Sequence, residues 1–454
     1  MCTGVDMGKE LRNVVVVDAA RSAFARGGRG KLVAARLDET AATVLRALLE
    51  RNPKVTPDMI EDVGLGQVGS AAELSGIGSD NIKKLAGLPQ ESASFQTNRQ
   101  CGSSMDVLHR IAQNIMVGAS ECGIAMGAER MARSLGGGGA SAGAAGGGAP
   151  SQRNRVTEFN MKLLDQNDVQ RAPAGDHDAL FSAPFPDRIM DQPPNASMLQ
   201  TAQNVAEAYK LDRRALDEFT VESHRKYGVA WDKGAYAEEI IALEVETPVF
   251  DDEGNWLPDE RGELVIFDQD EGYRPTTTME ALSNLKPVGG IESFTDSEIC
   301  ITAGNACPTN DGVSVALLMS EERALELGLE PLARIVGFGV AGVKQQFMGL
   351  GPIPATIRAL KHAGVEAGAI DRVEFNEAFA AQVMPSISDL GIAMEAVNVN
   401  GGSLAIGHPL GATGARLVGT VARELRRSGT KYGLATQCIG AGMGISTIVE
   451  SLDA

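Results

Sequence analysis

Four side chains that can form a covalent bond or move a proton stand in short motifs far apart in the chain. They are Cys101 in Asn-Arg-Gln-Cys-Gly-Ser, Asn376 in Asn-Glu-Ala-Phe-Ala, His408 in Gly-His-Pro-Leu-Gly-Ala-Thr-Gly and Cys438 in Cys-Ile-Gly-Ala-Gly-Met-Gly. A cysteine thiolate is a nucleophile, and a histidine elsewhere can take its proton. A second cysteine among glycines can move another proton beside exposed backbone N–H donors. Together these residues predict covalent acyl transfer.

The residues around Cys101 and His408 predict that each lies just before a helix. Apolar residues recur at helical spacing from Met105 to Met116, and a similar pattern runs from Leu417 to Leu425. Cys101 therefore falls at an expected helix N-terminus, where backbone donors favour a thiolate. We expect its thiol to be more acidic than that of a free cysteine.

Strands and helices alternate around these motifs. The expected order is a strand over Val14–Val17, a helix over Thr40–Leu49, a strand over Val63–Gly66, a helix after Cys101 and a strand over Gly123–Met126. This βαβ order predicts an α/β fold.

The second half of the chain repeats this order. Ile60-Glu-Asp-Val-Gly-Leu resembles Ile370-Asp-Arg-Val-Glu-Phe 310 positions later, the junction at Cys101 matches that at His408 after 307, and the strand near Ile124 matches one near Leu434 after 310. We therefore expect two similar halves with Cys101 and His408 at equivalent helix N-termini, meeting across a pseudo-twofold axis in one cleft.

Composition limits the class of protein. The chain has 454 residues, 43% of them hydrophobic, and a formal net charge of −18. An acidic surface argues against nucleic-acid binding, and no apolar run approaches the roughly 20 residues that span a bilayer. Residues 1–12 resemble neither a signal nor a transit peptide, so a cytoplasmic location is expected. Six cysteines are too sparse for a disulfide framework.

A segment between the halves breaks the repeat. It contains a glycine-rich stretch at 136–149, expected to be a flexible surface loop, followed by helical patterns over Thr201–Tyr209 and Arg214–Gly234 and a polar, hairpin-like stretch near Asp251–Asn255. It also contains a basic cluster, a candidate for binding a polyanion or simply a solvated helix face: Arg213, Arg214, His224, Arg225 and Lys226.

The four motifs, in this order, resemble those of the thiolases, which make or break a carbon–carbon bond between acyl groups carried on coenzyme A (CoA). The long stretch 401–416 resembles the thiolase histidine motif, and the resemblance extends from Val14 to the C-terminal Ser446-Thr-Ile-Val. It implies a thiolase-like α/β fold, in which two pseudo-symmetric, βαβ-rich halves carry an inserted loop domain. The expected domains are the N-terminal half at 1–130 and 277–295, the inserted loop domain at 131–276 and the C-terminal half at 296–454.

The resemblance also implies a role for each motif residue. Cys101 would carry the acyl group as a thioester, and His408 would take its proton and help bind the thioester oxygen. Asn376 would hold a water that completes this oxyanion site. Cys438 would move the proton at the α-carbon of acetyl-CoA, while the backbone N–H groups of Cys101 and Gly440 would form a second oxyanion hole.

Other residues are implied to contact the substrate. Ala378 and Phe379 would line the pantetheine tunnel, and Arg274 would lie near the nucleotide. Met198, in Ser-Met-Leu, occupies the place of a His-Met-Gly found in short-chain acetoacetyl-CoA thiolases, which predicts a different acyl pocket. Cys307, in Gly-Asn-Ala-Cys, replaces the usual serine and is expected to be a wall of the tunnel.

The expected activity is CoA-dependent, ping-pong cleavage of a longer or unusual 3-oxoacyl-CoA. The alternatives are a biosynthetic acetyl-CoA acetyltransferase that forms acetoacetyl-CoA, and a non-catalytic thiolase-like subunit. A decarboxylating ketoacyl synthase has one cysteine and two histidines, whereas this chain has Cys438 where the second histidine would stand.

The expected ligands are acyl-CoA and CoA as substrates, with no cofactor, no metal, no nucleic acid and no membrane. A homodimer or homotetramer is expected, and a hetero-complex stays possible.

Overall fold

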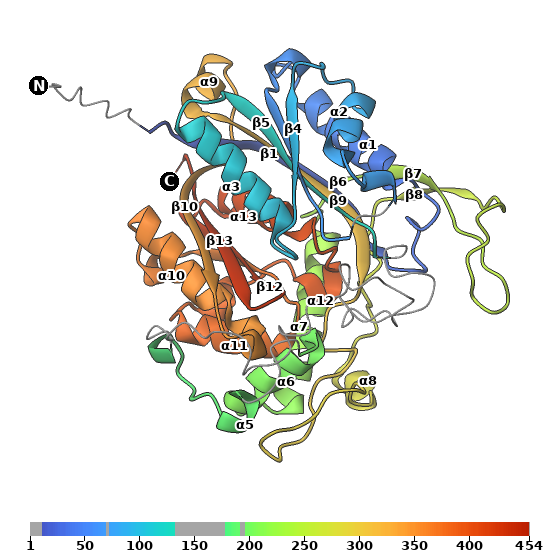
Figure 1. The fold of residues 1–454 in the computed structure, drawn as a ribbon, viewed down its shortest axis with the longest axis vertical. Helices are drawn as coiled ribbons and strands as arrows, with labels where there is room; N and C mark the ends of the chain where they lie inside the picture. Colours follow the sequence, from blue (N-terminus) through green and yellow to red (C-terminus); the bar gives the residue numbers. More distant parts are fainter. Residues whose placement is uncertain (1–10, 70–71, 132–177, 191–195, 454) are drawn as a thin grey trace, which may run out of the picture.

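A central sheet joins strands from both ends of the chain. The computed structural model describes residues 11–69, 72–131, 178–190 and 196–453, and within them this sheet has the order β11-β12-β13-β10-β1-β9-β5-β3-β4 (Figure 1). The strands are β1 (Val14–Ser22), β3 (Asp62–Gly66), β4 (Ala93–Thr97), β5 (Cys122–Glu129), β9 (Asn310–Ser320), β10 (Ala333–Gly342), β11 (Arg372–Phe375), β12 (Tyr432–Ile439) and β13 (Met443–Glu450), with the short β2 (Ala25–Arg26) on β9 and β6 (Ile240–Ile241) on β1. Where the halves meet, β1 pairs with β10 through Val14–Val16 and Ala333–Ile335.

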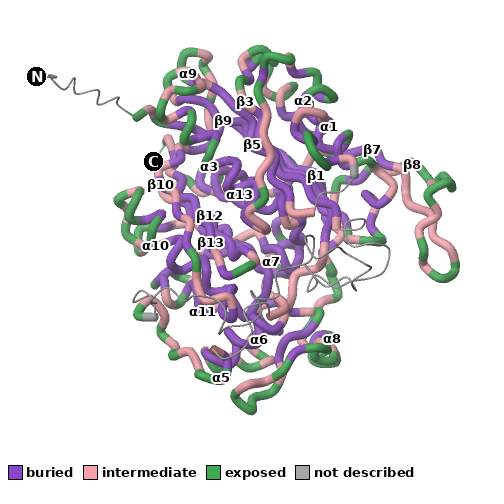
Figure 2. Tube along the Cα trace, in the orientation of Figure 1, coloured by how far each residue is buried: buried purple, intermediate pink, exposed green. Residues whose placement is uncertain are grey.

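Helices form three layers around the two halves of the sheet. One outer face is covered by α1 (Leu37–Arg51) and α2 (Gly78–Leu85), and the other by α10 (Pro352–Ala363) and α11 (Ala380–Asp389). Between the halves pack α3 (Ser103–Met116) and α13 (Thr413–Ser428), whose apolar residues share one buried cluster. The central strands are therefore buried on both faces (Figure 2). Burial on both faces explains their continuous apolar runs.

The repeat expected between the halves is present in the structure. Val63 of β3 pairs with Ile124 of β5, and 310 positions later Val373 of β11 pairs with Leu434 of β12. The two central helices also begin 310 positions apart, α3 at Ser103 and α13 at Thr413. The fold is thus the α/β architecture of two similar halves.

The equivalence expected for Cys101 and His408 needs one correction. Cys101 lies two residues before α3, whereas His408 lies five before α13. The added residues form a turn in which the backbone N–H groups of Ala412 and Thr413 both donate to the carbonyl oxygen of Pro409. The residue equivalent to Cys101 is therefore Gly411, and His408 stands three positions further back.

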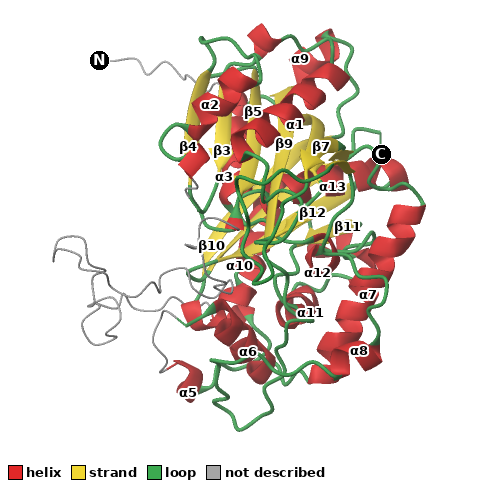
Figure 3. Cartoon of the chain, turned by 90° about the vertical axis from the view of Figure 1, so that its right-hand side faces the viewer, coloured by secondary structure: helices red, strands yellow, loops and turns green. Residues whose placement is uncertain are grey.

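The middle of the chain forms a mainly helical region at one end of the sheet (Figures 1 and 3). The helices are α5 (Asp187–Met190), α6 (Met198–Ala208), α7 (Arg213–Asp232) and α8 (Met279–Ser283), which confirms both expected helical patterns. The expected hairpin also forms, from β7 (Leu243–Glu246) and β8 (Leu264–Phe267). The remaining α-helices among the described residues are α9 (Glu321–Glu326) and α12 (Ser403–Ile406).

A buried ion cluster ties this region to the sheet. Arg21 of β1 is fully buried and binds Asp270 through both terminal guanidinium nitrogens, at 2.6 and 2.9 Å, and it also pairs with Glu239. Such a pair holds two segments in one geometry because separating them would leave a charge without a partner in the interior.

Two predictions about the organisation of the chain stay open. The expected glycine-rich loop at 136–149 lies outside the described residues. The expected domain ranges, 1–130 with 277–295, 131–276 and 296–454, stay predictions because hydrogen bonds continue from one half of the sheet into the other. Among the described helices, none combines the length and the apolar character needed to cross a membrane.

Candidate active site

The motif residues gather where parallel strands of both halves end. Asn376 directly follows β11, and Cys438 is the penultimate residue of β12, the parallel neighbour of β11. The backbone N–H of Asn376 donates to the carbonyl oxygen of Thr436 at 3.0 Å, which continues the ladder past the strand. Cys101 follows β4, which runs parallel to β3. The carboxyl ends of parallel strands are where open α/β sheets form ligand sites.

Cys101 sits on a tightly bonded turn. The residue before it, Gln100, has a φ of 47°, which is left-handed backbone that a residue with a side chain adopts only under tertiary constraint. The hydroxyl of Ser103 donates to the Gln100 carbonyl oxygen at 2.6 Å, and the side-chain amide of Gln437 donates to the Cys101 carbonyl oxygen at 2.6 Å. Gln437 precedes Cys438 in β12, so this bond fixes the loop of one cysteine against the strand of the other.

The surroundings of Cys101 correct the expectation of an acidic thiol. Burial raises the pKa of the Cys101 thiol to about 11, the backbone N–H of Gly440 opposes this rise, and the nearby Glu129 carboxylate adds to it. The energy of removing the thiolate from water therefore exceeds the stabilisation from the backbone donors. The resting thiol keeps its proton, and a nearby base must remove it. The backbone N–H of Gly440 faces the Cys101 sulfur.

His408 is held as a neutral base. The residue is 2% exposed, and burial, followed by the charge of Arg416, lowers the pKa of its imidazole to about 3. Nδ1 lies 2.6 Å from the hydroxyl of Thr413, which donates its own proton to the Pro409 carbonyl oxygen at 2.9 Å. The hydrogen-bond network therefore assigns the ring proton to Nδ1 and leaves the lone pair on Nε2. Nε2 lies 3.3 Å from the amide nitrogen of Asn376.

The backbone before His408 requires glycine. Gly407 has a φ of 111°, and a Cβ there would come within 2.6 Å of the side chain of Asn310. That side chain accepts the backbone N–H of His408 at 2.9 Å. The glycine and the asparagine together place the histidine at the edge of the site.

A buried chain of polar groups orients Asn376. Its Oδ1 accepts the hydroxyl of Ser403 at 2.7 Å, so its Nδ2 faces His408. The guanidinium of Arg416 donates to the same Ser403 hydroxyl at 3.1 Å and pairs with Glu374 at 2.5 Å. Both charged side chains are buried, so the orientation of the Asn376 amide is fixed from behind by an ion pair.

Cys438 is buried, and its thiol donates to Oε1 of Gln382 at 3.2 Å. Burial and then the proximity of Cys101 raise its pKa. The pKa of Cys307 is raised by burial and then by the proximity of Cys101 and Cys438. The structure thus brings all three cysteines into electrostatic range of one another.

The residues expected to line the substrate tunnel come together in one apolar cluster. Ala378, Phe379 and Cys438 are buried members of this cluster, and Met198 and Cys307 pack against it. The backbone N–H of Cys307 donates to the Ala378 carbonyl oxygen at 2.9 Å. These five residues are drawn from α6, the loop before β9, the start of α11 and the end of β12.

The turn after Cys438 has open space at its first glycine. A Cβ added to Gly440 would meet its closest neighbour, Gln100, only at an ordinary 3.6 Å. Packing within the chain therefore does not demand glycine here.

Arg274 lies away from this cluster, against α7. It is exposed, its backbone N–H donates to Nδ1 of His224 at 3.3 Å, and its guanidinium has no ion pair within the described part of the chain. The basic cluster of α7 is different, because its arginines bind carboxylates on the same helix: Arg213 with Asp217, Arg214 with Glu218 and Arg225 with Glu222. Only Arg214 and Arg225 lie on a solvated helix face; His224 is buried, and Arg213 and Lys226 are partly buried with their side chains bonded to backbone carbonyl oxygens.

Several site residues were not found from the sequence. Gln382 and Thr413 bind the catalytic candidates directly, Gln437 binds the Cys101 loop, and Glu129 accepts backbone N–H groups from Val68, Gly69 and Gly411. Burial raises the pKa of Glu129 to about 7. The available signal was a polar residue inside an apolar run, as at Gln382 among Ala380, Ala381 and Val383.

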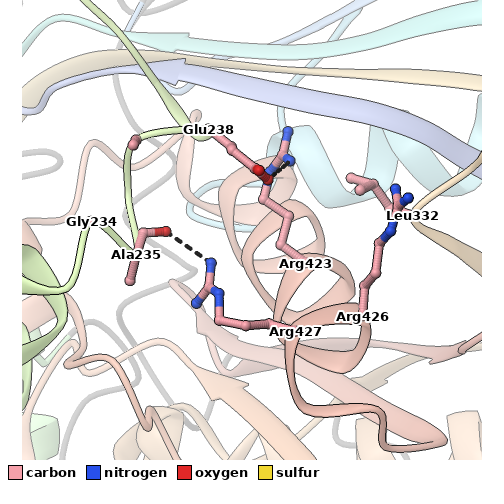
Figure 4. A pocket seen from close by; sticks show the side chains of 8 residues that line it. Gly234, Ala235, Glu238, Leu332, Arg423, Arg426 and Arg427 are labelled. Carbon is pink, nitrogen blue, oxygen red and sulfur yellow. Dashed lines mark hydrogen bonds and ion pairs between the residues drawn. The ribbon is translucent and has the colours of Figure 1, made fainter.

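A separate surface pocket of about 460 Å³ lies between the C-terminal part of α13 and the loop at 234–238 (Figure 4). Its arginines bind carboxylates: Arg423 to Asp18 and Glu238, Arg426 to Glu330 and Arg427 to Glu424. None of the predicted site residues lines it.

Comparisons with known proteins place the chain in a family. Residues 14–322 match the thiolase N-terminal domain, and residues 329–451 match the thiolase C-terminal domain. The chain is 36% identical over 443 residues to a 3-ketoacyl-CoA thiolase of Aliivibrio fischeri, covering 97% of this chain and 100% of the relative. It is 37% identical over 444 residues to an acetyl-CoA acetyltransferase of Thiocystis violacea, covering 97% and 99%.

The fold agrees with these matches. The crystal structure of the Bacillus anthracis acetyl-CoA acetyltransferase superposes with a TM-score of 0.78 at 31% identity, over 98% of this chain and 100% of that chain. With thiolase domains along nearly its whole length and a thiolase architecture, the chain belongs to the thiolase family and is an acyltransferase.

Proposed function

We propose that this protein cleaves a 3-oxoacyl-CoA with CoA, giving acetyl-CoA and an acyl-CoA shortened by two carbons, through a ping-pong reaction on Cys101. The observation that carries the proposal is the meeting of three parts: Cys101 against the Gly440 N–H, the neutral His408 beside Asn376, and the Cys438 thiol in electrostatic range of Cys101. This set supplies a nucleophile, a base and a second proton carrier.

In the first half-reaction, Nε2 of His408 accepts the Cys101 proton and the thiolate attacks the 3-oxo carbon. The oxygen that becomes negative is stabilised by His408 and by a water held on Asn376. The bond between C2 and C3 then breaks, and the Cys438 thiol protonates C2 of the departing acetyl-CoA. The N–H groups of Cys101 and Gly440 stabilise the enolate oxygen.

In the second half-reaction, incoming CoA transfers its thiol proton to the Cys438 thiolate and attacks the thioester on Cys101. The tetrahedral intermediate collapses, Cys101 leaves, and His408 returns its proton to that sulfur. CoA is a substrate, and no step requires a cofactor. All protons and both thiols are restored at the end of the cycle.

Apolar side chains and one basic side chain would bind different parts of the substrate. Ala378, Phe379 and Cys307 form an apolar wall for the pantetheine arm, and Met198 borders the acyl side. Arg274, exposed and without an ion-pair partner among the described residues, is suited to the nucleotide phosphates of CoA. The serine before Met198, in place of histidine, favours a longer or unusual acyl chain over acetoacetyl-CoA.

The second candidate is the biosynthetic direction, condensation of two acetyl-CoA molecules. It is favoured by the acetyl-CoA acetyltransferase name of one close relative. Comparing kcat/KM for acetoacetyl-CoA with that for longer and ring-bearing 3-oxoacyl-CoAs separates the two. A clear preference for the four-carbon substrate contradicts the degradative proposal.

The proposed chemistry is tested by locating the acyl group. Purified protein is incubated with acyl-CoA, digested and mapped by mass spectrometry, and thiolysis is assayed in parallel. We expect the adduct on Cys101 and no thiolysis in Cys101→Ser, whereas Cys300→Ser, a matched control in the same apolar cluster, keeps both. An adduct only on Cys307 or Cys438 would overturn the assignment. Folded protein with no activity on any 3-oxoacyl-CoA would favour the non-catalytic subunit.

The proposal also covers the oligomeric state and the cellular location of the protein. We expect a cytoplasmic homodimer or homotetramer; β9, paired on both sides by β1 and β5, is a central element of each subunit. Light scattering decides the assembly, and a fully active monomer contradicts it. Activity that appears only after a second protein is added would point to a hetero-complex.

A further inference from the structure

We propose that Gln382 is a positioning residue for the proton transfer at the α-carbon: it holds the proton of the Cys438 thiol on sulfur and fixes the orientation of that thiol. This inference rests on the proposed function, because it assigns the state in which Cys438 begins the cleavage reaction.

The geometry fixes the Gln382 amide in one orientation. Gln382 is fully buried on the first turn of α11. Its Nε2 donates to the Asn376 carbonyl oxygen at 2.9 Å, and its Oε1 accepts from the Cys438 sulfur at 3.2 Å. Rotating the amide by half a turn would set Oε1 against the Asn376 carbonyl oxygen, two acceptors without a proton between them. The oxygen therefore faces the thiol.

The side chain has little room to leave this position. A Cβ added to Gly349 would come within 2.8 Å of the Gln382 Cβ, so the chain at Gly349 packs directly against the glutamine. The backbone N–H of Gln382 donates to the Phe379 carbonyl oxygen at 3.2 Å. The turn that places the apolar wall at Phe379 therefore also places the amide at Cys438.

Oε1 of Gln382, at 3.2 Å from the Cys438 sulfur, stabilises the protonated form of the thiol. The S–H form donates to Oε1, whereas a thiolate has no proton to donate and would face a carbonyl dipole of the same sign. In cleavage, the S–H bond breaks as the new C–H bond forms on the departing acetyl-CoA, which leaves Cys438 as a thiolate. The thiol of CoA then returns a proton to that sulfur. Gln382 gives up no proton in either step and acts by holding the Cys438 thiol.

The test separates proton transfer at carbon from activation of the Cys101 thiol. Gln382→Met keeps the length of the side chain and removes both hydrogen bonds. Its matched control is Gln203→Met on α6, because Gln203 is also a fully buried glutamine whose Oε1 accepts from a cysteine, Cys300, at 3.6 Å. Each protein is assayed for hydrogen–deuterium exchange at the α-carbon of acetyl-CoA and for the rate at which iodoacetamide alkylates Cys101, followed by peptide mass.

We expect α-carbon exchange in Gln382→Met to fall roughly 10- to 100-fold relative to Gln203→Met, because aligned proton transfer contributes about that much or more. Alkylation of Cys101 is expected to stay within about threefold of the control, since removal of the Cys101 proton uses His408 and not Cys438. Equal exchange in the two variants overturns the inference. An equal fall in exchange and alkylation also overturns it, because Gln382 would then act through Asn376 and His408.

A second variant keeps the inference testable if the methionine variant does not fold. In Gln382→Glu, the protonated carboxyl group can donate to the Asn376 carbonyl oxygen and accept from the Cys438 thiol, which restores both bonds. We expect its exchange rate, taken relative to wild type at each pH, to rise as pH falls; a constant ratio contradicts the inference. If wild-type protein exchanges acetyl-CoA protons but cleaves no 3-oxoacyl-CoA, the proposed substrate is wrong while the role of Gln382 is still decided.

Discussion

The hydroxyl of Thr413 lies 2.6 Å from Nδ1 of His408 and donates its own proton to the Pro409 carbonyl oxygen at 2.9 Å. A hydroxyl whose proton is already used can only accept from the imidazole, so the ring proton stays on Nδ1. The lone pair is thereby kept on Nε2, beside Asn376. A residue on the first turn of α13 thus selects the nitrogen that acts as the base.

Replacing Thr413 by valine is therefore expected to slow acylation of Cys101. Valine fills the same buried space but cannot hold Nδ1, so part of the histidine population adopts the unproductive tautomer or orientation. We expect a loss of about 10- to 100-fold in the acylation rate, part of what a positioned base contributes. Thr413→Ser, which keeps the hydroxyl, is the control. Equal rates for the valine and serine variants in quenched-flow mass measurements would contradict this assignment.

The alkylation rate of Cys101 should keep increasing with pH into the alkaline range. Its pKa is raised to about 11 by burial, so the thiolate fraction increases about tenfold per pH unit well past the value for an ordinary thiol. Iodoacetamide labelling of Cys101, followed by peptide mass, measures this between pH 7 and about 10. A free cysteine thiol alkylated under the same conditions serves as the reference.

A labelling rate that levels off near pH 8 would show that the helix N-terminus governs the thiol after all. That result would restore the expectation drawn from the sequence, in which backbone donors make Cys101 acidic. The two outcomes differ by several pH units and are readily distinguished.

The sequence predicted the parts of the site that are local in the chain. Cys101 before a helix, the glycines around His408 and the strand that carries Cys438 all follow from short patterns, because the residues that define them are neighbours. The repeat of 310 positions predicted that both halves contribute to one site. The same repeat predicted that His408 is the structural equivalent of Cys101. This was wrong, because the extra turn at Pro409 places His408 three positions before the equivalent residue, Gly411.

The contacts that support the site could not be predicted in this way. Gln382 and Cys438 are 56 positions apart, and Glu129 and Gly411 are 282 apart, so the fold rather than any pattern brings them together. The prediction of an acidic Cys101 thiol was wrong for a related reason. Burial depends on what packs over the thiol, whereas a helix N-terminus is visible in the local sequence.

Stability should fall in acid partly because His109 is buried in its neutral form. Burial lowers its pKa to about 3, against 6.5 for the unfolded chain, and its Nε2 lies 2.8 Å from the Thr447 hydroxyl. Between these values the unfolded state binds a proton that the folded state does not, so the stabilisation is complete above pH 6.5 and decreases as pH falls towards 3.

His109→Gln, which can still bond Thr447, removes this linkage. We expect its free energy of unfolding to depend less steeply on pH between 6 and 4, by up to about 1.4 kcal/mol per pH unit. Urea denaturation at a series of pH values measures the slope. Parallel slopes for wild type and variant would mean that the histidine is protonated in the folded protein.

Replacing one partner of the buried pair of Arg416 and Glu374 should destabilise the fold far more than replacing both. Arg416→Met leaves the Glu374 carboxyl buried without its cation, so the rise in its pKa caused by burial is no longer opposed by the Arg416 charge. We expect about 3–5 kcal/mol of destabilisation for this single variant and clearly less for Arg416→Met combined with Glu374→Gln.

The same pair of variants tests how the Asn376 amide is held. The double variant removes the Arg416 donor to Ser403 but leaves the Ser403 hydroxyl bonded to Oδ1 of Asn376. If Ser403 suffices, the double variant recovers stability in urea denaturation and acylates Cys101 at nearly the wild-type rate. If it regains stability but acylates slowly, the guanidinium is needed to keep the serine, and through it Asn376, aimed at His408. A double variant no more stable than Arg416→Met would contradict the account of the buried charge.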